Sequence, residues 1–312
     1  MNLSPIAFFA YNRPIHTKKT LKYLKKNKLA KKSLIYIFLD APKDKKSKNK
    51  VIEVKKIINN IKGFKKKIII LRKKNFGLAN NFIQGISYVV KKHGKIIVLE
   101  DDILTSPYFL EYMNDALNLY KNENKVAAVS GYSYPINNKY NDYFFLKMGE
   151  CWGWATWKNS WQTFEKNGKK LLKMIEKKNY ISDFNFDDSY DFFKQLKNFC
   201  LKKNQSWAIR WYASIYLKNK LTLYPPKSLV QNIGMDGFGV HSGVSRDFDS
   251  ELIKKYEKPK KILIQDSKYH REKIKLFFKK IGKNDNLFER IKKKNKSHTK
   301  CILKSITLNI TI

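Results

Sequence analysis

In Lys95-Ile96-Ile97-Val98-Leu99-Glu100-Asp101-Asp102-Ile103-Leu104, an apolar run leads directly into three consecutive carboxylates. Acidic residues are scarce in this chain, with 26 Asp and Glu against 65 Lys and Arg, so three in a row is unusual. A continuous apolar run is typical of a strand buried on both faces of a parallel sheet. Ligands of such sheets bind beyond the carboxyl ends of the strands, where carboxylates suit a hard divalent cation. The alternative is that Glu100 and Asp101 begin a solvated loop.

The residues around this segment alternate between strand and helix patterns. Strands are expected at 6–10, 34–39, 68–71 and 95–99, and helices at 17–27, 51–61, 78–90 and from 106 onward. Ser106 is the expected N-cap of the last of these helices, with Pro107 at its first position. Four such alternations in about 120 residues match the ~30 residues of a βαβ unit. The sequence therefore predicts an α/β fold with a mostly parallel sheet flanked by helices.

Polar residues follow each of the four predicted strands. They are Asn12 and Arg13, then Asp40, then Arg72 to Asn75, and finally Glu100 to Asp102. Because the carboxyl ends of parallel strands meet at one edge of a sheet, these side chains are expected to form one binding cleft.

The character of the sequence changes near residue 144. All six tryptophans lie between residues 152 and 211, and tryptophan is common both at recognition surfaces and in cores. The stretch 183–191 is acidic and aromatic, and the Gly-rich loop 233–243 carries Asp236 and His241. From about residue 258 the chain is rich in lysine and weakly patterned, which is typical of a solvated helix or a disordered tail.

The formal net charge of +39 has two interpretations. It reflects either a lysine-rich composition of the source genome or affinity for phosphate-rich partners and anionic membrane surfaces. The three cysteines form no CxxC pair and give no metal-ligand spacing, and their odd number favours a reducing compartment. No signal-peptide pattern and no run of 18 apolar residues is present. We expect a cytoplasmic protein, and peripheral contact of its basic tail with the inner face of the plasma membrane, or with a partner, is the secondary interpretation of that tail.

Several segments, taken in order, resemble glycosyltransferases of the GT-A fold. The similarity is to the N-acetylglucosaminyltransferase I type and to bacterial relatives near glycosyltransferase family 2. The matching segments are 75–79, 98–103, 106–109, 129–131, 151–157 with Trp161, and 228–234. The resemblance covers roughly residues 5–245 and divides the chain into parts. It implies a nucleotide-sugar-binding half at 1–135, an acceptor-binding and catalytic half of the same domain at 136–250, and a basic extension at 251–312.

The resemblance also implies roles for individual residues. Asp102 and His241 would bind Mn²⁺ or Mg²⁺, which stabilises the diphosphate leaving group, although His241 also suits an exposed loop position with no ligand role. Asp101 would contact the ribose and Asp40 the base, although Asp40 also suits a turn at the end of a strand. The remaining residues of the expected nucleotide-sugar site are Asn12, Arg13, Arg72, Asn75 and Glu100. The residues expected to contact the acceptor are Trp152, Trp154 and Trp207.

The catalytic base is the point at which the sequence departs from this family. The segment that matches the family's base, 206–211, contains no carboxylate, whereas an inverting transfer needs a general base. Glu150 and Asp236 are the first candidates for this base, and Asp187 and Asp188 are less favoured candidates.

The function expected from these features is metal-dependent transfer of a hexosyl or N-acetylhexosaminyl group in bacterial surface-polysaccharide synthesis. The expected donor is a UDP-sugar, and the expected acceptor is a glycan or a lipid-linked sugar. A nucleic-acid-binding protein is one alternative, but the aromatic residues do not interleave with the basic runs. A sugar nucleotidyltransferase would need a Gly-rich loop after the first strand, and 10–14 has no glycine. A catalytically inactive glycan-binding relative is the third alternative.

Overall fold

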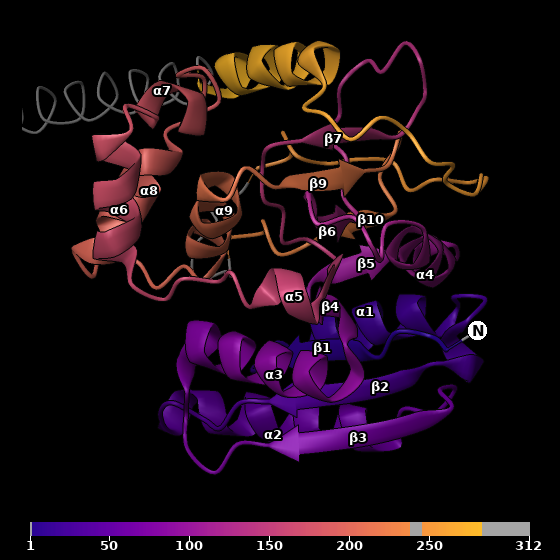
Figure 1. The fold of residues 1–312 in the computed structure, drawn as a ribbon. Coiled ribbons are helices and arrows are strands. Elements are labelled where there is room, and N and C mark those ends of the chain that lie inside the picture. Colours follow the sequence, from indigo (N-terminus) through magenta and orange to yellow (C-terminus); the bar gives the residue numbers. More distant parts are fainter. Residues whose placement is uncertain (1, 238–244, 283–312) are drawn as a thin grey trace, which may run out of the picture.

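The computed structural model describes residues 2–237 and 245–282, and one eight-stranded sheet runs through the middle of this part of the chain (Figure 1). The strands are β1 (Ile6–Ala10), β2 (Leu34–Leu39), β3 (Lys66–Leu71), β4 (Lys95–Glu100), β5 (Ile103–Thr105), β6 (Val126–Ser130), β7 (Phe144–Leu146), β8 (Trp154–Trp157), β9 (Leu221–Tyr224) and β10 (Val230–Asn232). The helices are α1 (Pro14–Lys25), η1 (Ala30–Lys32), α2 (Lys45–Asn60), α3 (Gly77–His93), α4 (Phe109–Leu119), α5 (Lys158–Trp161), α6 (Gly168–Lys177), α7 (Ile181–Phe184), α8 (Phe192–Cys200) and α9 (Ala208–Leu217). Residues 268–282 form a further helix.

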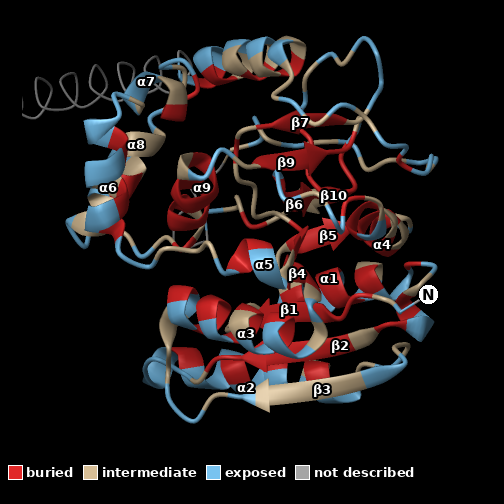
Figure 2. Cartoon of the chain, in the orientation of Figure 1, coloured by how far each residue is buried: buried red, intermediate tan, exposed pale blue. Residues whose placement is uncertain are grey.

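The first half of the sheet is parallel, in the order β3-β2-β1-β4. Every residue of β1 is buried, as are most residues of β2 and β4, whereas the edge strand β3 is only half-buried (Figure 2). Continuous apolar sequence is what a strand covered on both faces requires. The predicted α/β fold with a mostly parallel sheet is confirmed.

The second half of the chain extends the same sheet. Strand β8 pairs antiparallel with both β4 and β6, and β9 and β7 continue beyond β6. Trp154 of β8 is aligned with Val98 on one side and with Ser130 on the other. Because β8 lies between strands from the two halves, the sequence division near residue 135 falls within a single sheet.

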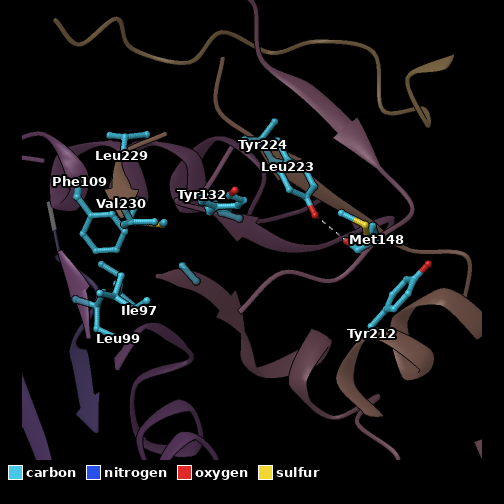
Figure 3. Packing of buried hydrophobic residues seen from close by; sticks show 14 of the residues in the cluster. Ile97, Leu99, Phe109, Tyr132, Met148, Tyr212, Leu223, Tyr224, Leu229 and Val230 are labelled. Carbon is cyan, nitrogen blue, oxygen red and sulfur yellow. Dashed lines mark hydrogen bonds between the residues drawn. The ribbon is translucent and has the colours of Figure 1, made fainter. Parts of the chain in front are cut away.

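The sheet has a hydrophobic core on each of its two faces, because successive side chains along a strand point to opposite faces. Phe8 and Ile37 face the cluster that includes Leu21 and Leu24 of α1, whereas Phe9 packs in the other cluster, which contains much of α3. Successive side chains of a strand point to opposite faces, so helices cover both faces of the sheet. The first cluster continues into the second half of the chain. Figure 3 shows Ile97, Leu99, Phe109, Tyr132, Met148, Tyr212, Leu223, Tyr224, Leu229 and Val230 of this cluster.

One predicted helix start is wrong. Helix α4 begins at Phe109, and Ser106 and Pro107 lie in a turn that precedes it. The Ser106 hydroxyl accepts a hydrogen bond from the Tyr108 N–H at 3.2 Å, which stabilises the turn in place of the expected N-cap.

The expectation of a solvated tail is also wrong for residues 258–282. Ile274 and Phe278 are buried, and Asp266 forms a β-bridge with Phe145 of β7. The Ile262 N–H donates to the Tyr120 hydroxyl at 3.1 Å. This segment therefore packs on the second half of the sheet, as the yellow helix in Figure 1 shows. Residues 283–312 lie outside the described part, within which no helix is long and apolar enough to cross a membrane.

Candidate active site

The acidic triplet lies at the carboxyl end of β4, where the chain turns into β5. The Asp101 carboxylate is nearly buried and accepts hydrogen bonds from the Tyr11 N–H and the Thr17 hydroxyl, both at 3.3 Å. The Thr20 hydroxyl donates to the backbone oxygen of Asp101 at 2.8 Å. The end of β1 and the first turns of α1 therefore hold this turn in place.

Asp102 has one paired and one unpaired carboxylate oxygen. Its Oδ2 accepts a hydrogen bond from Arg13 Nη1 at 2.8 Å, in an ion pair whose two side chains are largely buried. Its Oδ1 is buried and has no hydrogen-bond partner in the described part of the chain. A buried charged oxygen without a partner is costly, so this atom is a natural point of contact for a cation.

Burial raises the pKa of all three carboxyl groups, and their mutual repulsion adds to the effect for Glu100 and Asp101. The pKa of Asp101 rises to about 7, through burial and the neighbouring charge of Asp102. The pKa of Glu100 lies well above its ordinary value for the same reasons. The pKa of Asp102 is raised by burial, while Arg13 and His16 act in the opposite direction. Because burial and mutual repulsion disfavour the ionised form of these carboxyl groups, a cation bound beside them would stabilise their negative charge.

A segment from the second half of the chain closes over the triplet. Strand β10 pairs antiparallel with β5, and the Ile233 N–H donates to the Asp102 backbone oxygen at 2.9 Å. Gly234 follows, so close to Asp102 that a Cβ atom at this position would lie 2.1 Å from Asp102 Oδ2. Glycine is therefore needed at position 234, at the start of the Gly-rich loop, because any side chain would collide with the Asp102 carboxylate.

Asp236 lies at the same edge, two residues further along. Its Oδ2 is 3.0 Å from Nε2 of His16 on α1, and that nitrogen is also 3.3 Å from the Ile233 backbone oxygen. The structure therefore brings Asp236 into the neighbourhood of the triplet. His241 lies outside the described residues, so its predicted role as a metal ligand stays a prediction.

The residues after β2 and β3 meet at the same edge of the sheet, but they largely contact one another. The Asp40 carboxylate accepts three backbone hydrogen bonds at 2.9 Å, from Ala41, Phe76 and Gly77. It thereby holds the N-terminus of α3, where a negative charge is favourable. Asn75 donates to the Ala41 backbone oxygen at 2.6 Å. These contacts favour the turn-forming alternative for Asp40.

Arg72 and Asn12 lie beside this group. The Arg72 Nε–H donates to Asn81 Oδ1 at 2.9 Å, and its guanidinium lies 4.7 Å from the centre of the Phe76 ring. Burial lowers the pKa of Arg72, which Asp40 partly offsets. Asn12 is half-buried in the loop between β1 and α1. The strand ends thus converge as predicted, and contact with a nucleotide stays a prediction for these residues.

The residues present fit a divalent cation of the hard type. Mg²⁺ is commonly held by one or two carboxylates together with phosphate oxygens of a substrate, rather than by a complete protein cage. Asp102 supplies such a carboxylate, with Oδ1 unpaired. Within residues 2–237 and 245–282, no three His, Cys, Asp or Glu side chains group to form a fuller metal site.

A cavity of about 240 Å³ lies among residues of the second half of the chain. Its lining residues are mostly aromatic: Tyr132, Tyr134, Gly149, Glu150, Cys151, Trp152, Tyr190, Phe192, Gln195, Ser206, Ala208, Ile209, Trp211, Tyr212, Met235, Phe248 and Phe278. Met235 stands between Gly234, which contacts Asp102, and Asp236, which pairs with His16. The Cys151 thiol has its pKa raised by burial and by the charges of Glu150, Glu100 and Asp102. The cavity and the triplet are therefore neighbouring parts of one site.

Glu150 is the carboxylate of this cavity. Its Oε1 accepts the N–H groups of Cys151 and Trp152 at 2.8 and 3.3 Å, and its Oε2 accepts the Tyr134 hydroxyl at 3.3 Å. Burial raises the pKa of Glu150 to about 6, against the effect of these hydrogen bonds. A carboxylate with a pKa just below neutrality suits a general base.

Two of the predicted acceptor-binding tryptophans belong to the core. Trp154 and Trp207 are 0% and 2% exposed and stack at 5.7 Å between ring centres, beside Trp161 and Trp211. They present no surface to an acceptor in this structure, because β8 is an interior strand and Trp207 packs on α3. Trp152 differs from them, since it is half-buried and lines the cavity.

The other two candidate bases lie elsewhere. Asp187 forms an ion pair with Arg271 at 2.9 Å, and Asp188 accepts the Ser182 hydroxyl. Neither residue lines the cavity. His16 and Tyr134 were missed as parts of the site, because nothing in their local sequence indicates that the fold brings them to Asp236 and Glu150.

No protein-family model and no curated protein sequence matches this chain. Among solved structures, the chain is similar to the mannosyltransferase PcManGT from Pyrobaculum calidifontis in complex with GDP-Man and Mn²⁺, at 9% identity and a TM-score of 0.37 over 70% of each chain. It is also similar to residues 1–349 of S. aureus TarS, at 15% identity and a TM-score of 0.28, over 40% of this chain and 34% of that chain. A third similarity is to glucosyl-3-phosphoglycerate synthase from Mycobacterium tuberculosis in complex with Mn²⁺, UDP-Glc and phosphoglyceric acid. There the identity is 6% and the TM-score 0.30, over 52% of this chain and 58% of that chain. At these identities and scores the similarities identify no family for this chain.

Proposed function

We propose that this chain is a metal-dependent glycosyltransferase that moves a sugar from a nucleotide-diphosphate sugar to a hydroxyl group of an acceptor. The observation that carries the proposal is the buried Oδ1 of Asp102 at the carboxyl end of β4, which has no hydrogen-bond partner within residues 2–237 and 245–282. Such a position is where open α/β sheets bind their ligands. Gly234 lies so close to this carboxylate that a Cβ atom there would come within 2.1 Å of Asp102 Oδ2, so any side chain at this position would disturb the site.

Residues of the first half of the chain would hold the donor. Asp102 would hold Mn²⁺ or Mg²⁺ together with the phosphate oxygens of the donor, and Arg13 adds a cation beside them. When bound, the metal ion neutralises charge on the diphosphate leaving group. The nucleoside would lie along the strand ends toward Asn12 and Asp40, and a UDP-sugar is the donor that we expect.

Residues of the second half would hold the acceptor and take its proton. At pH 7 a Glu150 with a pKa of about 6 is mostly ionised, so it can accept a proton from a hydroxyl group. The two N–H groups and the Tyr134 hydroxyl keep its carboxylate in one orientation. A base on the acceptor side is the arrangement that a single, inverting displacement needs. Asp236 is the second candidate base, because its carboxylate is paired with His16 at the rim of the same site.

The experiment is a thermal-unfolding screen of UDP-glucose, UDP-galactose, UDP-N-acetylglucosamine and GDP-mannose, each with and without Mn²⁺. A ligand at 100 times its Kd stabilises the folded state by about 2.7 kcal/mol. We expect at least one donor to stabilise the wild type only with Mn²⁺, and to be turned over on an added acceptor. Asp102→Asn should abolish both effects while it leaves the unfolding temperature of the free protein nearly unchanged.

The control is Glu53→Gln, which removes an exposed carboxylate on α2. It should behave as the wild type in every condition. Equal stabilisation of wild type and Asp102→Asn by a donor and Mn²⁺ would overturn the proposal.

A further inference from the structure

The cavity beside Glu150 is completed by residues that follow the Gly-rich loop. Phe278, on the helix at 268–282, is 2% exposed and lines the cavity together with Phe248. Its ring centre lies 4.9 Å from that of Tyr190 and 5.4 Å from that of Tyr134, and both of these residues also line the cavity. The helix therefore forms one wall of the cavity.

Arg271 anchors this helix seven residues before Phe278, at the i, i+7 spacing that places both residues on the same helix face. Its guanidinium is 12% exposed and pairs with Asp183 at 2.7 Å, Asp187 at 2.9 Å and Asp266 at 3.3 Å. Nε donates to Asp187 as well, at 3.3 Å, so Asp187 is held by two bonds. A guanidinium group is planar and donates several hydrogen bonds in fixed directions. It therefore holds carboxylate partners in a more defined geometry than the ammonium group of a lysine does.

The loop that receives Arg271 has a strained backbone. The backbone of this loop lies in the left-handed region at three consecutive positions, with φ angles of 55° at Phe186, 56° at Asp187 and 57° at Asp188. Residues other than glycine rarely adopt this conformation. The Phe186 ring lies 4.5 Å from the Arg271 guanidinium and meets the Phe278 ring edge-on at 5.7 Å. Strained residues persist only where surrounding contacts hold them, and they gather near functional sites. The contacts of Arg271 thus connect this loop to the cavity wall.

We propose that Phe278 determines which saccharide ring the cavity accepts, and that Arg271 is its positioning residue. The aromatic walls suit the apolar faces of a sugar ring, while Glu150, Gln195 and Ser206 offer polar partners for its hydroxyl groups. The volume of about 240 Å³ is below the ~300–1,000 Å³ of typical ligand pockets, so one ring fits better than an extended chain. The proposal rests on the proposed function in treating this ring as the acceptor.

The test measures direct saccharide binding by saturation-transfer NMR, with methyl β-D-glucoside and methyl N-acetyl-β-D-glucosaminide as probes. Phe278→Leu shortens the wall and enlarges the cavity without introducing a polar group. We expect the ratio of the two dissociation constants to shift about tenfold toward the bulkier probe, as a changed apolar pocket does. Leu276→Ala is the control, since Leu276 lies on the same helix, is 52% exposed and does not line the cavity. Its ratio should equal that of the wild type.

Donor binding is measured on the same samples with UDP-glucose, GDP-mannose and Mn²⁺. If a donor binds but Phe278→Leu keeps the wild-type saccharide ratio, the role of Phe278 is refuted and the proposed function stands. If no donor binds but the ratio shifts, the saccharide site stands and the transferase proposal falls. Failure of the wild type to bind either probe would refute the saccharide site.

Arg271 is tested by its coupling to Phe278. Arg271→Gln should shift the saccharide ratio in the same direction as Phe278→Leu, and the double variant should shift it no further. Arg271→Lys should recover part of the wild-type ratio. Lys275→Gln is the control, because Lys275 lies on the same helix and reaches Asp187 only at 3.9 Å. Independent, additive effects of Arg271→Gln and Phe278→Leu would contradict the positioning role.

Discussion

The Nη1 atom of Arg13 lies 2.8 Å from Oδ2 of Asp102, and this ion pair joins the loop after β1 to the turn after β4. It neutralises one side of the Asp102 carboxylate and leaves Oδ1, on the other side, without a hydrogen-bond partner among the residues that the structure describes. The same arginine would lie beside a diphosphate held at this edge of the sheet. Arg13 therefore has two roles in the proposed site, orienting a carboxylate and attracting an anion.

Replacing Arg13 should separate these roles. Hydrogen bonds to charged groups are worth about 1.5–3 kcal/mol, so Arg13→Gln should weaken binding of UDP in the presence of Mn²⁺ by about tenfold or more. Arg13→Lys retains the charge and should lose less. Isothermal titration with UDP and Mn²⁺ measures both changes, with Arg246→Gln as an exposed control. Equal UDP affinities for wild type and Arg13→Gln would place the diphosphate elsewhere.

Gly234 should tolerate no side chain. A Cβ atom there would lie 2.1 Å from Asp102 Oδ2 and 2.9 Å from Arg13 Nη1, so Gly234→Ala must displace the ion pair. We expect loss of Mn²⁺-dependent donor binding in a protein that remains folded by circular dichroism. Gly282→Ala is the matched control, because a Cβ atom at Gly282 meets nothing within 4 Å. Normal donor binding by Gly234→Ala would show that this close approach is unimportant for the site.

Glu150 should impose a pH dependence on turnover. With its pKa raised to about 6, the base is protonated and inactive below that pH, so kcat should fall as the pH drops through about 6. Glu150→Gln should remove most of the activity at every pH, and Glu53→Gln, an exposed change on α2, should have no effect. A pH profile of kcat that is flat between 5 and 8 would exclude Glu150 as the base.

The same group should affect stability in the opposite sense to an ordinary salt-bridged carboxylate. Between the ordinary pKa of 4.5 and the folded value of about 6, the folded protein binds a proton that the unfolded chain has released. Stability therefore falls as the pH rises through this window, by roughly 2 kcal/mol at 1.36 kcal/mol per unit. Urea unfolding of Glu150→Gln should lack this decline and show higher stability at pH 7.

Asp40 should contribute more to stability than a typical helix cap. Its carboxylate accepts three backbone N–H groups in a buried position, and leaving buried donors unpaired costs about 1–3 kcal/mol. We expect Asp40→Ala to lower the free energy of unfolding by about 2–3 kcal/mol. Asp44→Ala, which removes the capping box of α2, should lower it by about 1 kcal/mol. If Asp40→Ala changes donor affinity without changing stability, the nucleotide-binding role is favoured instead.

Local sequence was sufficient to predict the parallel half of the sheet and the edge at which its polar residues meet. Strands β1 and β2 match their predicted limits, because a run of apolar residues specifies a strand covered on both faces whatever its neighbours are. The position of Asp102 follows from the same pattern, since the strands are parallel and their carboxyl ends share one edge. These features depend on residues that are close together in the chain.

Contacts between distant segments decided the remainder. Whether Trp154 is a surface or a core residue depends on the insertion of β8 between β4 and β6. This insertion pairs Trp154 with Val98, 56 positions earlier, and with Ser130, 24 positions earlier. The approach of Gly234 to Asp102 depends on the pairing of β10 with β5. Likewise, the helix that carries Phe278 is tied to the rest of the chain by contacts of Arg271 with Asp183 and Asp187, which lie 84 to 88 residues earlier. Hydrophobicity and charge specify that such groups need partners, but only packing of the whole chain selects which partners they meet.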